Sequence, residues 1–99
     1  MTINILAIGG STRPGSSSEQ ALRVAGRGAE GAGAKVTYIT GRDLMFPIYD
    51  TETPDRNDNA KKFLEAVAAA DGLIISTPGY HGGMSGMIKN ALDYIEDLR

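Results

Sequence analysis

The sequence predicts an α/β fold in which a parallel sheet has helices on both faces. Strand-like runs at 3–8, 35–40 and 73–77 alternate with three helical patterns. This order predicts two successive right-handed crossovers, which place the strands parallel. Of the 99 residues, 41% are hydrophobic and 22% are charged, which is typical of a globular domain.

The three strands differ in composition in a way that predicts their places in the sheet. Ile3–Ile8 is apolar at nearly every position, as expected of a central strand that helices cover on both sides. Lys35–Thr40 is rich in β-branched and aromatic residues but carries polar ones, which favours a position nearer the edge. Leu73–Thr77 is the third predicted strand.

Three helices are predicted between and after these strands. The first begins after a run of serines, of which Ser17 or Ser18 is the expected cap, and presents a narrow face of small residues. Gly26 and Gly28 weaken this helix but permit a close approach to the sheet. The other two predicted helices span Asn59–Ala70 and Gly86–Leu98.

The connection Gly41–Asp58 is long and has little periodicity, which in a compact domain often marks a functional or mobile segment. Its apolar residues are expected to pack on the sheet or on a partner subunit. Three parallel strands form a thin sheet whose outer strand presents an apolar edge. We therefore expect residues 1–99 to be a single, incomplete domain, either the front part of a larger doubly wound domain or a unit completed by another polypeptide.

Charge and composition exclude several classes of function. A net charge of −2 does not suit nucleic acid or an anionic membrane surface as a partner. The absence of cysteine removes disulfides and zinc-thiolate sites, and one histidine makes metal binding a poor hypothesis. No apolar stretch approaches the roughly 20 residues that cross a bilayer. We expect a cytoplasmic protein without a membrane or nucleic-acid partner.

The first loop (residues 9–18) has the chemistry of a phosphate site. It combines glycines, hydroxyl side chains and one cation, Arg13, directly before a predicted helix. Free N–H groups at a helix start attract anions, and a guanidinium matches phosphate oxygens. Gly10 and Gly15 have P-loop spacing, but Ser16 replaces the required lysine, which speaks against ATP or GTP hydrolysis. The pattern suits a single terminal phosphate, as in a mononucleotide.

The second loop (residues 78–86) follows the third strand and suits a flat ring. Its backbone amides could bind the polar edge of a heterocycle, with Tyr80 packed beside it. Tyr80 could equally be a packing residue, and His81 a simple hydrogen-bonding residue of the loop. Ser76 and Ser85 lie near His81 in sequence, but no nucleophile-elbow pattern supports a hydrolase.

Both loops resemble the signatures of the NADPH-dependent FMN reductase family, whose members have a flavodoxin-like fold. The first match is Gly-Gly-Ser-Thr-Arg-Pro-Gly-Ser-Ser-Ser at 9–18. The second, more specific match is Thr-Pro-Gly-Tyr-His-Gly-Gly-Met-Ser-Gly-Met-Ile-Lys-Asn-Ala-Leu-Asp at 77–93. The resemblance covers essentially the whole chain, although family members are nearly twice as long.

The resemblance implies a flavoprotein that binds FMN and uses NADPH or NADH as co-substrate. It implies hydride transfer to FMN and on to a small-molecule acceptor such as a quinone, an azo compound, a metal ion or free flavin. The full-length protein is expected to be a homodimer or homotetramer. Because the flavin carries the chemistry, no catalytic protein residue is expected. The expected FMN-binding residues are Ser11, Arg13, Ser16, Ser17 and Ser18 at the phosphate, and Pro78, Gly79, Tyr80, His81 and Gly82 along the ring.

Three positions depart from the family pattern. Many members have Glu where this chain has Gly79, Asn where it has His81, and Asn where it has Ser18. A serine hydroxyl can still donate to a phosphate, whereas the role of His81 does not follow from an asparagine. Two alternatives to the reductase stay open: a flavodoxin-type electron carrier without enzymatic activity, and an inactive fragment.

Overall fold

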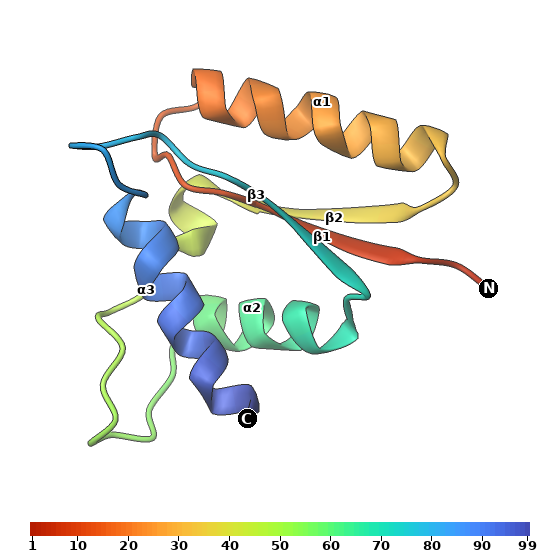
Figure 1. Cartoon of the computed structure of the whole chain (residues 1–99). Helices are drawn as coiled ribbons and strands as arrows, with labels where there is room; N and C mark the ends of the chain where they lie inside the picture. Colours follow the sequence, from red (N-terminus) through yellow and green to blue (C-terminus); the bar gives the residue numbers. More distant parts are fainter.

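A computed structural model describes all residues, 1–99, as a three-stranded parallel sheet with helices on both faces (Figure 1). The strands are β1 (Asn4–Gly9), β2 (Lys35–Thr40) and β3 (Gly72–Ser76), in the order β2-β1-β3. The apolar strand is therefore central and the more polar β2 lies at an edge, which confirms both predictions. The predicted strand bounds are correct to within one residue.

The helices form one layer on each face of the sheet. Helix α1 (Ser17–Gly31) covers one face, and α2 (Asp58–Ala69) and α3 (Gly86–Tyr94) cover the other (Figure 1). The last turn of the predicted third helix tightens into the 3₁₀ helix η2 (Ile95–Leu98). None of the helices has the length and apolar character needed to cross a bilayer.

The start of α1 differs from its prediction. Ser16, one residue before the helix, is the N-cap, and its Oγ accepts the Glu19 N–H at 3.2 Å. The prediction of Ser17 or Ser18 as the cap was wrong. Both lie in the first helical turn, because the extended backbone of Ser16 is the last non-helical position (φ −61°, ψ 161°). Ser17 and Ser18 are thereby released from capping.

The main core lies between the sheet and the layer of α2 and α3. It contains Leu6 and Ile8 of β1, Phe63 of α2 and Ile88 of α3, all buried. On the opposite face, α1 approaches closely because Gly26 has no side chain: a Cβ there would lie 2.0 Å from the Tyr38 hydroxyl. The expectation that a helical glycine serves packing is confirmed at Gly26.

The outer strand β3 has an apolar edge, as the sequence predicts. Leu73 and Ile75 keep 41% and 42% of their surface exposed. Figure 1 shows β3 and β1 crossing the molecule together, with α1 on one side and α2 on the other.

The long connection after β2 packs against the rest of the domain, although its sequence has little periodicity. It begins with the 3₁₀ helix η1 (Gly41–Leu44), whose Leu44 is fully buried in the main core. Phe46 packs edge-on against Tyr94, whereas Ile48 is 82% exposed. The expectation that apolar residues here pack within the domain is thus confirmed for Leu44 and Phe46.

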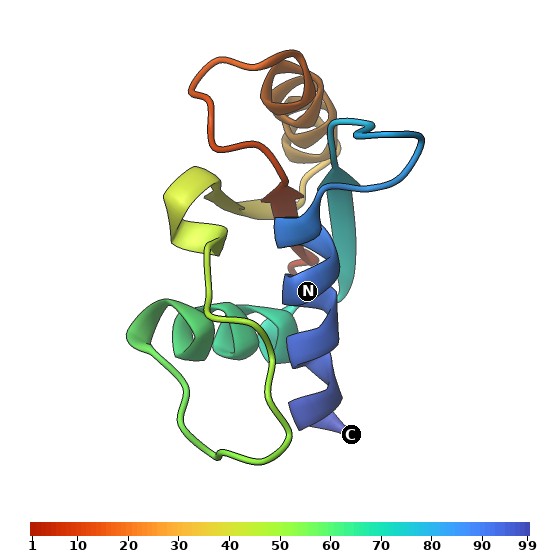
Figure 2. The ribbon, with the colours of Figure 1, turned by 90° about the vertical axis from the view of Figure 1, so that its left-hand side faces the viewer.

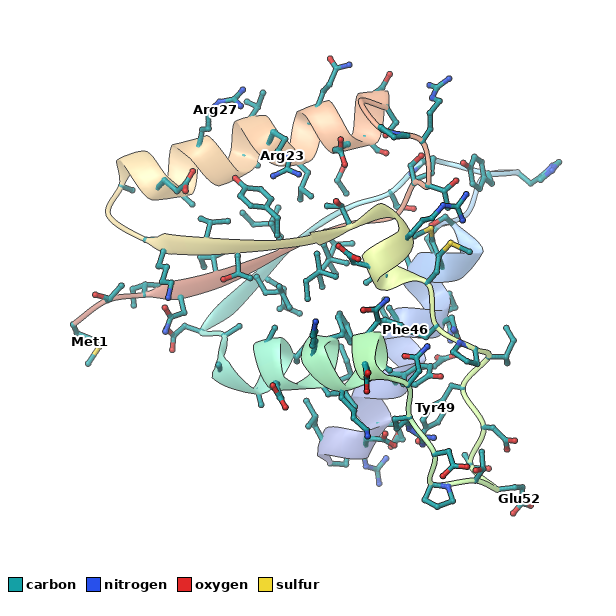
Figure 3. The ribbon with its side chains drawn as sticks, turned by 180° about the vertical axis from the view of Figure 1, so that it is seen from behind. Met1, Arg23, Arg27, Phe46, Tyr49 and Glu52 are labelled. Carbon is teal, nitrogen blue, oxygen red and sulfur yellow. The ribbon has the colours of Figure 1, made fainter.

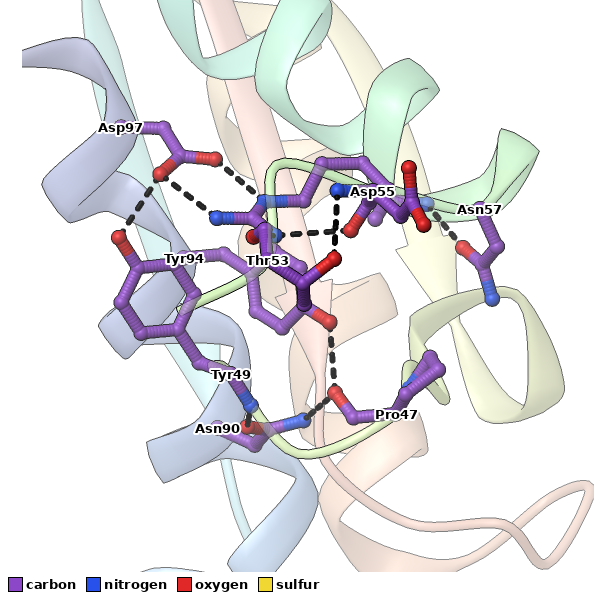
Figure 4. Close-up of polar contacts among 10 residues, drawn as sticks. Pro47, Tyr49, Thr53, Asp55, Asn57, Asn90, Tyr94 and Asp97 are labelled. Atoms are coloured by element: carbon purple, nitrogen blue, oxygen red, sulfur yellow. Dashed lines mark hydrogen bonds and ion pairs between the residues drawn. The ribbon is translucent and has the colours of Figure 1, made fainter. Parts of the chain in front are cut away.

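Two polar clusters hold this connection against α3 and η2 (Figure 4). Asn90 donates to the carbonyls of Phe46 and Pro47 and accepts the Tyr49 N–H at 2.8 Å. Further along, Arg56 makes a bidentate contact with Asp97 at 2.6 and 3.1 Å. The Tyr49 hydroxyl donates to the same carboxylate at 2.8 Å. Hydrogen bonds from Arg56, and then from Tyr49, hold the pKa of Asp97 below its usual range.

The close approach of β1 to α3 gives a first prediction. A Cβ on Gly10 would lie 2.2 Å from Ile88 Cγ1 and 2.7 Å from Ser85 Oγ, both in buried side chains. Gly10→Ala should therefore lower the free energy of unfolding by about 1–3 kcal/mol. Gly28→Ala is the control, since nothing lies within 4 Å of its Cβ position, and it should gain up to about 1 kcal/mol. Urea unfolding measures both, and equal effects would contradict the packing assignment.

The Arg56–Asp97 contact gives a second prediction, on pH dependence. A carboxyl whose pKa is lowered on folding stabilises the fold above its unfolded pKa, and this contribution is lost as pH falls through the folded value. Asp97→Asn should therefore be less stable than the parent chain at about pH 7, and the difference should shrink below about pH 4. Urea unfolding across this range tests it. A difference that is the same at every pH would contradict it.

Candidate functional site: a cleft between two loops

The two loops lie at the same end of the sheet, at the carboxyl ends of β1 and β3 (Figure 2). This is where the strand order reverses, since β2 lies on one side of β1 and β3 on the other. In open parallel sheets, ligands bind in the crevice at such a reversal. The position of both loops therefore follows from the topology alone.

Three hydrogen bonds join the ends of β1 and β3 to one another and to the starts of α1 and α3. Gly10 N–H donates to the Ser76 carbonyl at 2.9 Å, which joins the first loop to the end of β3. The Ser76 hydroxyl donates to the Ser18 carbonyl at 2.6 Å, which joins β3 to α1. Ser85 N–H donates to the Thr77 hydroxyl at 2.9 Å, which joins the start of α3 to the end of β3. The walls of the crevice are therefore bonded to one another.

A cleft of about 720 Å³ opens between the loops, and most of the residues that line it are polar. We call it the main cleft. This volume lies within the range of small-molecule and cofactor sites. It is lined by Ser11, Thr12, Arg13, Ser16, Ser17, Ser18, Ala21, Ser76, Thr77, Pro78 and Tyr80.

The helix start at this cleft retains donors that the protein itself does not use. The N–H groups of Glu19 and Gln20 are bound by the side chain and carbonyl of Ser16. Those of Ser17 and Ser18 have no protein acceptor. The Arg13 guanidinium has neither a hydrogen bond nor an ion pair within the chain. Free first-turn amides beside a free guanidinium are what a phosphate requires.

The sequence-predicted residues fall into two groups. All five of the first loop line the main cleft, together with Pro78 and Tyr80 of the second. Ser16 is buried as the helix cap, with its Oγ 3.2 Å from Ser18 Oγ. Gly79, His81 and Gly82 do not line the cleft and are exposed.

The tip of the second loop is a tight hairpin turn. Tyr80 and Gly83 form an isolated bridge, and Gly83 N–H donates to the Tyr80 carbonyl at 3.0 Å. Both central residues have positive φ, 52° at His81 and 80° at Gly82, as in a type I′ turn. Such a turn prefers Asn-Gly. The exposed position of His81 at the tip follows from this geometry.

Four residues of the lining were not among the expected FMN-binding residues: Thr12, Ala21, Ser76 and Thr77. Ser76 and Thr77 are polar residues at the end of an otherwise apolar strand, and that change was the available signal. Ala21 lies one helical turn after Ser17 and Ser18 and thus faces the same side of α1. A small residue there leaves room in the cleft beside α1.

The topology and the cleft define an α/β protein with a mononucleotide-type crevice. The sequence model of the NADPH-dependent FMN reductase family matches residues 3–98, and the chain belongs to this family. An NAD(P)H-dependent FMN reductase of Pseudomonas aeruginosa is 34% identical over 95 residues, which is 93% of this chain and 49% of that protein. An FMN-dependent NADPH-azoreductase of Staphylococcus haemolyticus is 60% identical over 81 residues, covering 63% of this chain and 43% of the relative.

The fold is also that of a known flavoenzyme. FerB, an NAD(P)H:(acceptor) oxidoreductase from Paracoccus denitrificans, superimposes with a TM-score of 0.76 at 23% identity. The match covers 94% of this chain and 50% of FerB. The predicted flavodoxin-like fold and the family resemblance are thus confirmed. The chain spans about half the length, or less, of the relatives it matches.

The turn at His81 gives a third prediction. His81→Asn should raise the free energy of unfolding by a few tenths to about 1 kcal/mol, because asparagine tolerates positive φ better in this turn. His81→Ala removes the same imidazole but gains no such tolerance, so it is the matched control. Urea unfolding of both variants measures the difference. An alanine variant at least as stable as the asparagine variant would contradict the turn assignment.

Proposed function

We propose that this chain binds FMN in the main cleft as part of an NAD(P)H-dependent FMN oxidoreductase. The observation that carries this proposal is the set of unsatisfied donors on the first loop. The free amides of Ser17 and Ser18, with the guanidinium of Arg13, form a complete phosphate-binding set. The hydroxyls of Ser11 and Ser18 lie in the same lining and add further donors.

The rest of the cleft suits the flavin ring and ribityl chain. Pro78 and Tyr80 line the opposite wall, where Tyr80 offers an aromatic surface that is 58% exposed. The hydroxyls of Ser76 and Thr77 bind neighbouring backbone groups and hold this wall in position. Gly79 lies between the two lining residues and, having no side chain, leaves the approach to the backbone open. His81 and Gly82 lie at the tip of the second loop, outside the lining of the main cleft.

FMN bound in this cleft would supply two-electron redox chemistry, accepting hydride from NADPH or NADH and reducing a second acceptor. The chain's part in this reaction is to bind and orient. Arg13 and the α1 amides hold the charged tail, and the wall formed by Pro78 and Tyr80 holds the ring. None of the lining residues has to act as an acid or base, in agreement with a lining that contains no carboxylate or imidazole.

The acceptor class is proposed from the relatives. The Staphylococcus haemolyticus protein is named an azoreductase, and a Burkholderia relative, 43% identical over 56 residues, is named a 2-hydroxy-1,4-benzoquinone reductase. We propose a quinone or azo compound as acceptor for the present protein as well. We further propose a homodimer or homotetramer, as the family resemblance implies, and a cytoplasmic location, which the lack of cysteine favours.

Flavin binding provides the fourth prediction. Arg13→Ala should weaken FMN binding about 10- to 100-fold, since a charged hydrogen bond contributes roughly 1.5–3 kcal/mol. Riboflavin, which lacks the phosphate, should bind the parent and the variant alike. Arg27→Ala is the matched control, because Arg27 is exposed on α1 and lines no cleft (Figure 3). Quenching of flavin fluorescence measures the affinities of all three proteins for both ligands.

Flavin binding and NADPH consumption together distinguish the three functions that the sequence leaves open: a reductase, a flavodoxin-type carrier and an inactive fragment. Unchanged FMN affinity in Arg13→Ala would contradict the phosphate site. Consumption of NADPH with FMN and a quinone supports the reductase. Tight FMN binding without any NADPH consumption would instead indicate a flavodoxin-type carrier. No flavin binding by the chain would indicate the inactive fragment.

A further inference from the structure

A second groove lies on the other side of the first loop, between that loop and the end of β2. We call it the arginine groove. Its volume is about 350 Å³. It is lined by Ser11, Thr12, Arg13, Pro14, Glu19, Thr40, Gly41 and Arg42, and it has no hydrophobic lining residue. Such a lining suits phosphoryl and hydroxyl groups rather than a ring.

The groove contains two guanidinium groups without a carboxylate partner. Arg42 makes a single side-chain contact, with Met45 Sδ at 3.6 Å, and Arg13 makes none. Glu19 is the one acidic side chain in the lining, and its Oε2 already accepts the Gly15 N–H at 3.1 Å. The charges facing the groove therefore sum to +1, with two cations free to bind an anion.

The backbone places Arg42 next to the first loop. Gly41 has φ of 58°, so the chain turns sharply where β2 ends and η1 begins. A Cβ on Gly41 would lie 3.9 Å from the Ser11 carbonyl, which shows how near the two segments are. In Figure 2, η1 lies beneath the first loop, on the side away from the second loop. Arg42 lines the arginine groove but not the main cleft.

These observations indicate two anion sites, the main cleft and the arginine groove, which lie on either side of the first loop. FMN carries one phosphate, and the α1 amides with Arg13 are sufficient for it. NADPH, named in the family description, differs from NADH by one further phosphate, on the adenosine ribose. We propose that the arginine groove, through Arg42, binds this 2′-phosphate of the co-substrate. This inference rests on the proposed function and names the residue that would favour NADPH over NADH.

The test measures equilibrium binding of 2′,5′-ADP, which carries the 2′-phosphate, and of 5′-AMP, which lacks it. Calorimetric titrations are made with and without saturating FMN. The parent chain should bind 2′,5′-ADP more tightly than 5′-AMP. Arg42→Ala should remove this preference, weakening 2′,5′-ADP binding about 10- to 100-fold. Arg27→Ala, which removes an equal charge from α1, should leave it unchanged.

The FMN affinity of Arg42→Ala is measured in parallel. An unchanged FMN affinity with lost 2′,5′-ADP binding supports the proposal. Loss of FMN affinity instead would assign Arg42 to the flavin phosphate and overturn it. Equal binding of 2′,5′-ADP and 5′-AMP by the parent chain, or an equal loss in Arg27→Ala, would also overturn it. Both probes carry the same 5′-phosphate, so the preference for 2′,5′-ADP over 5′-AMP reports on the 2′-phosphate even without FMN, and failure of flavin binding is a separate result.

Discussion

The hydrogen bond from Gly10 N–H to the Ser76 carbonyl joins the ends of β1 and β3, and the candidate site depends on this junction. It brings together two loops that are more than sixty residues apart in sequence. The junction is possible because Gly10 has no side chain to collide with Ile88 and Ser85 at the start of α3. Packing of the main core and the shape of the main cleft are therefore set at the same point.

The hydrogen-bond donors of the first loop lie next to this junction, and some of them have no acceptor within the protein. Ser16 caps α1 and satisfies the amides of Glu19 and Gln20, while those of Ser17 and Ser18 stay unbound. A helix that began two residues later would use the Ser18 hydroxyl as its cap in place of that of Ser16. The same loop separates the main cleft from the arginine groove, so that Arg13 lines both and Arg42 only the second. One short segment can thereby serve two phosphoryl groups.

The sequence predicted the parallel sheet, its central strand and the two loops, because these depend on local patterns and on general rules of connection. It did not predict the cap at Ser16, since four serine or glycine positions could end the loop equally well. The sequence also did not predict the contacts that hold the long connection in place. Leu44 is buried in the main core, and Arg56 binds Asp97, which lies 41 residues later in the chain. Such contacts depend on tertiary packing. Arg42 was not singled out because its neighbour in space, the first loop, lies some thirty residues earlier.

The central claim is that the main cleft receives a phosphate at the start of α1 and a ring along Pro78 and Tyr80. Amide chemical shifts in a ¹⁵N-labelled chain, titrated separately with FMN and with riboflavin, test it most directly. FMN should shift the amides of Ser17 and Ser18 as well as those around Tyr80, and riboflavin only the latter. Shifts of Ser17 and Ser18 that are equal for both ligands, or shifts confined to other surfaces, would contradict the claim.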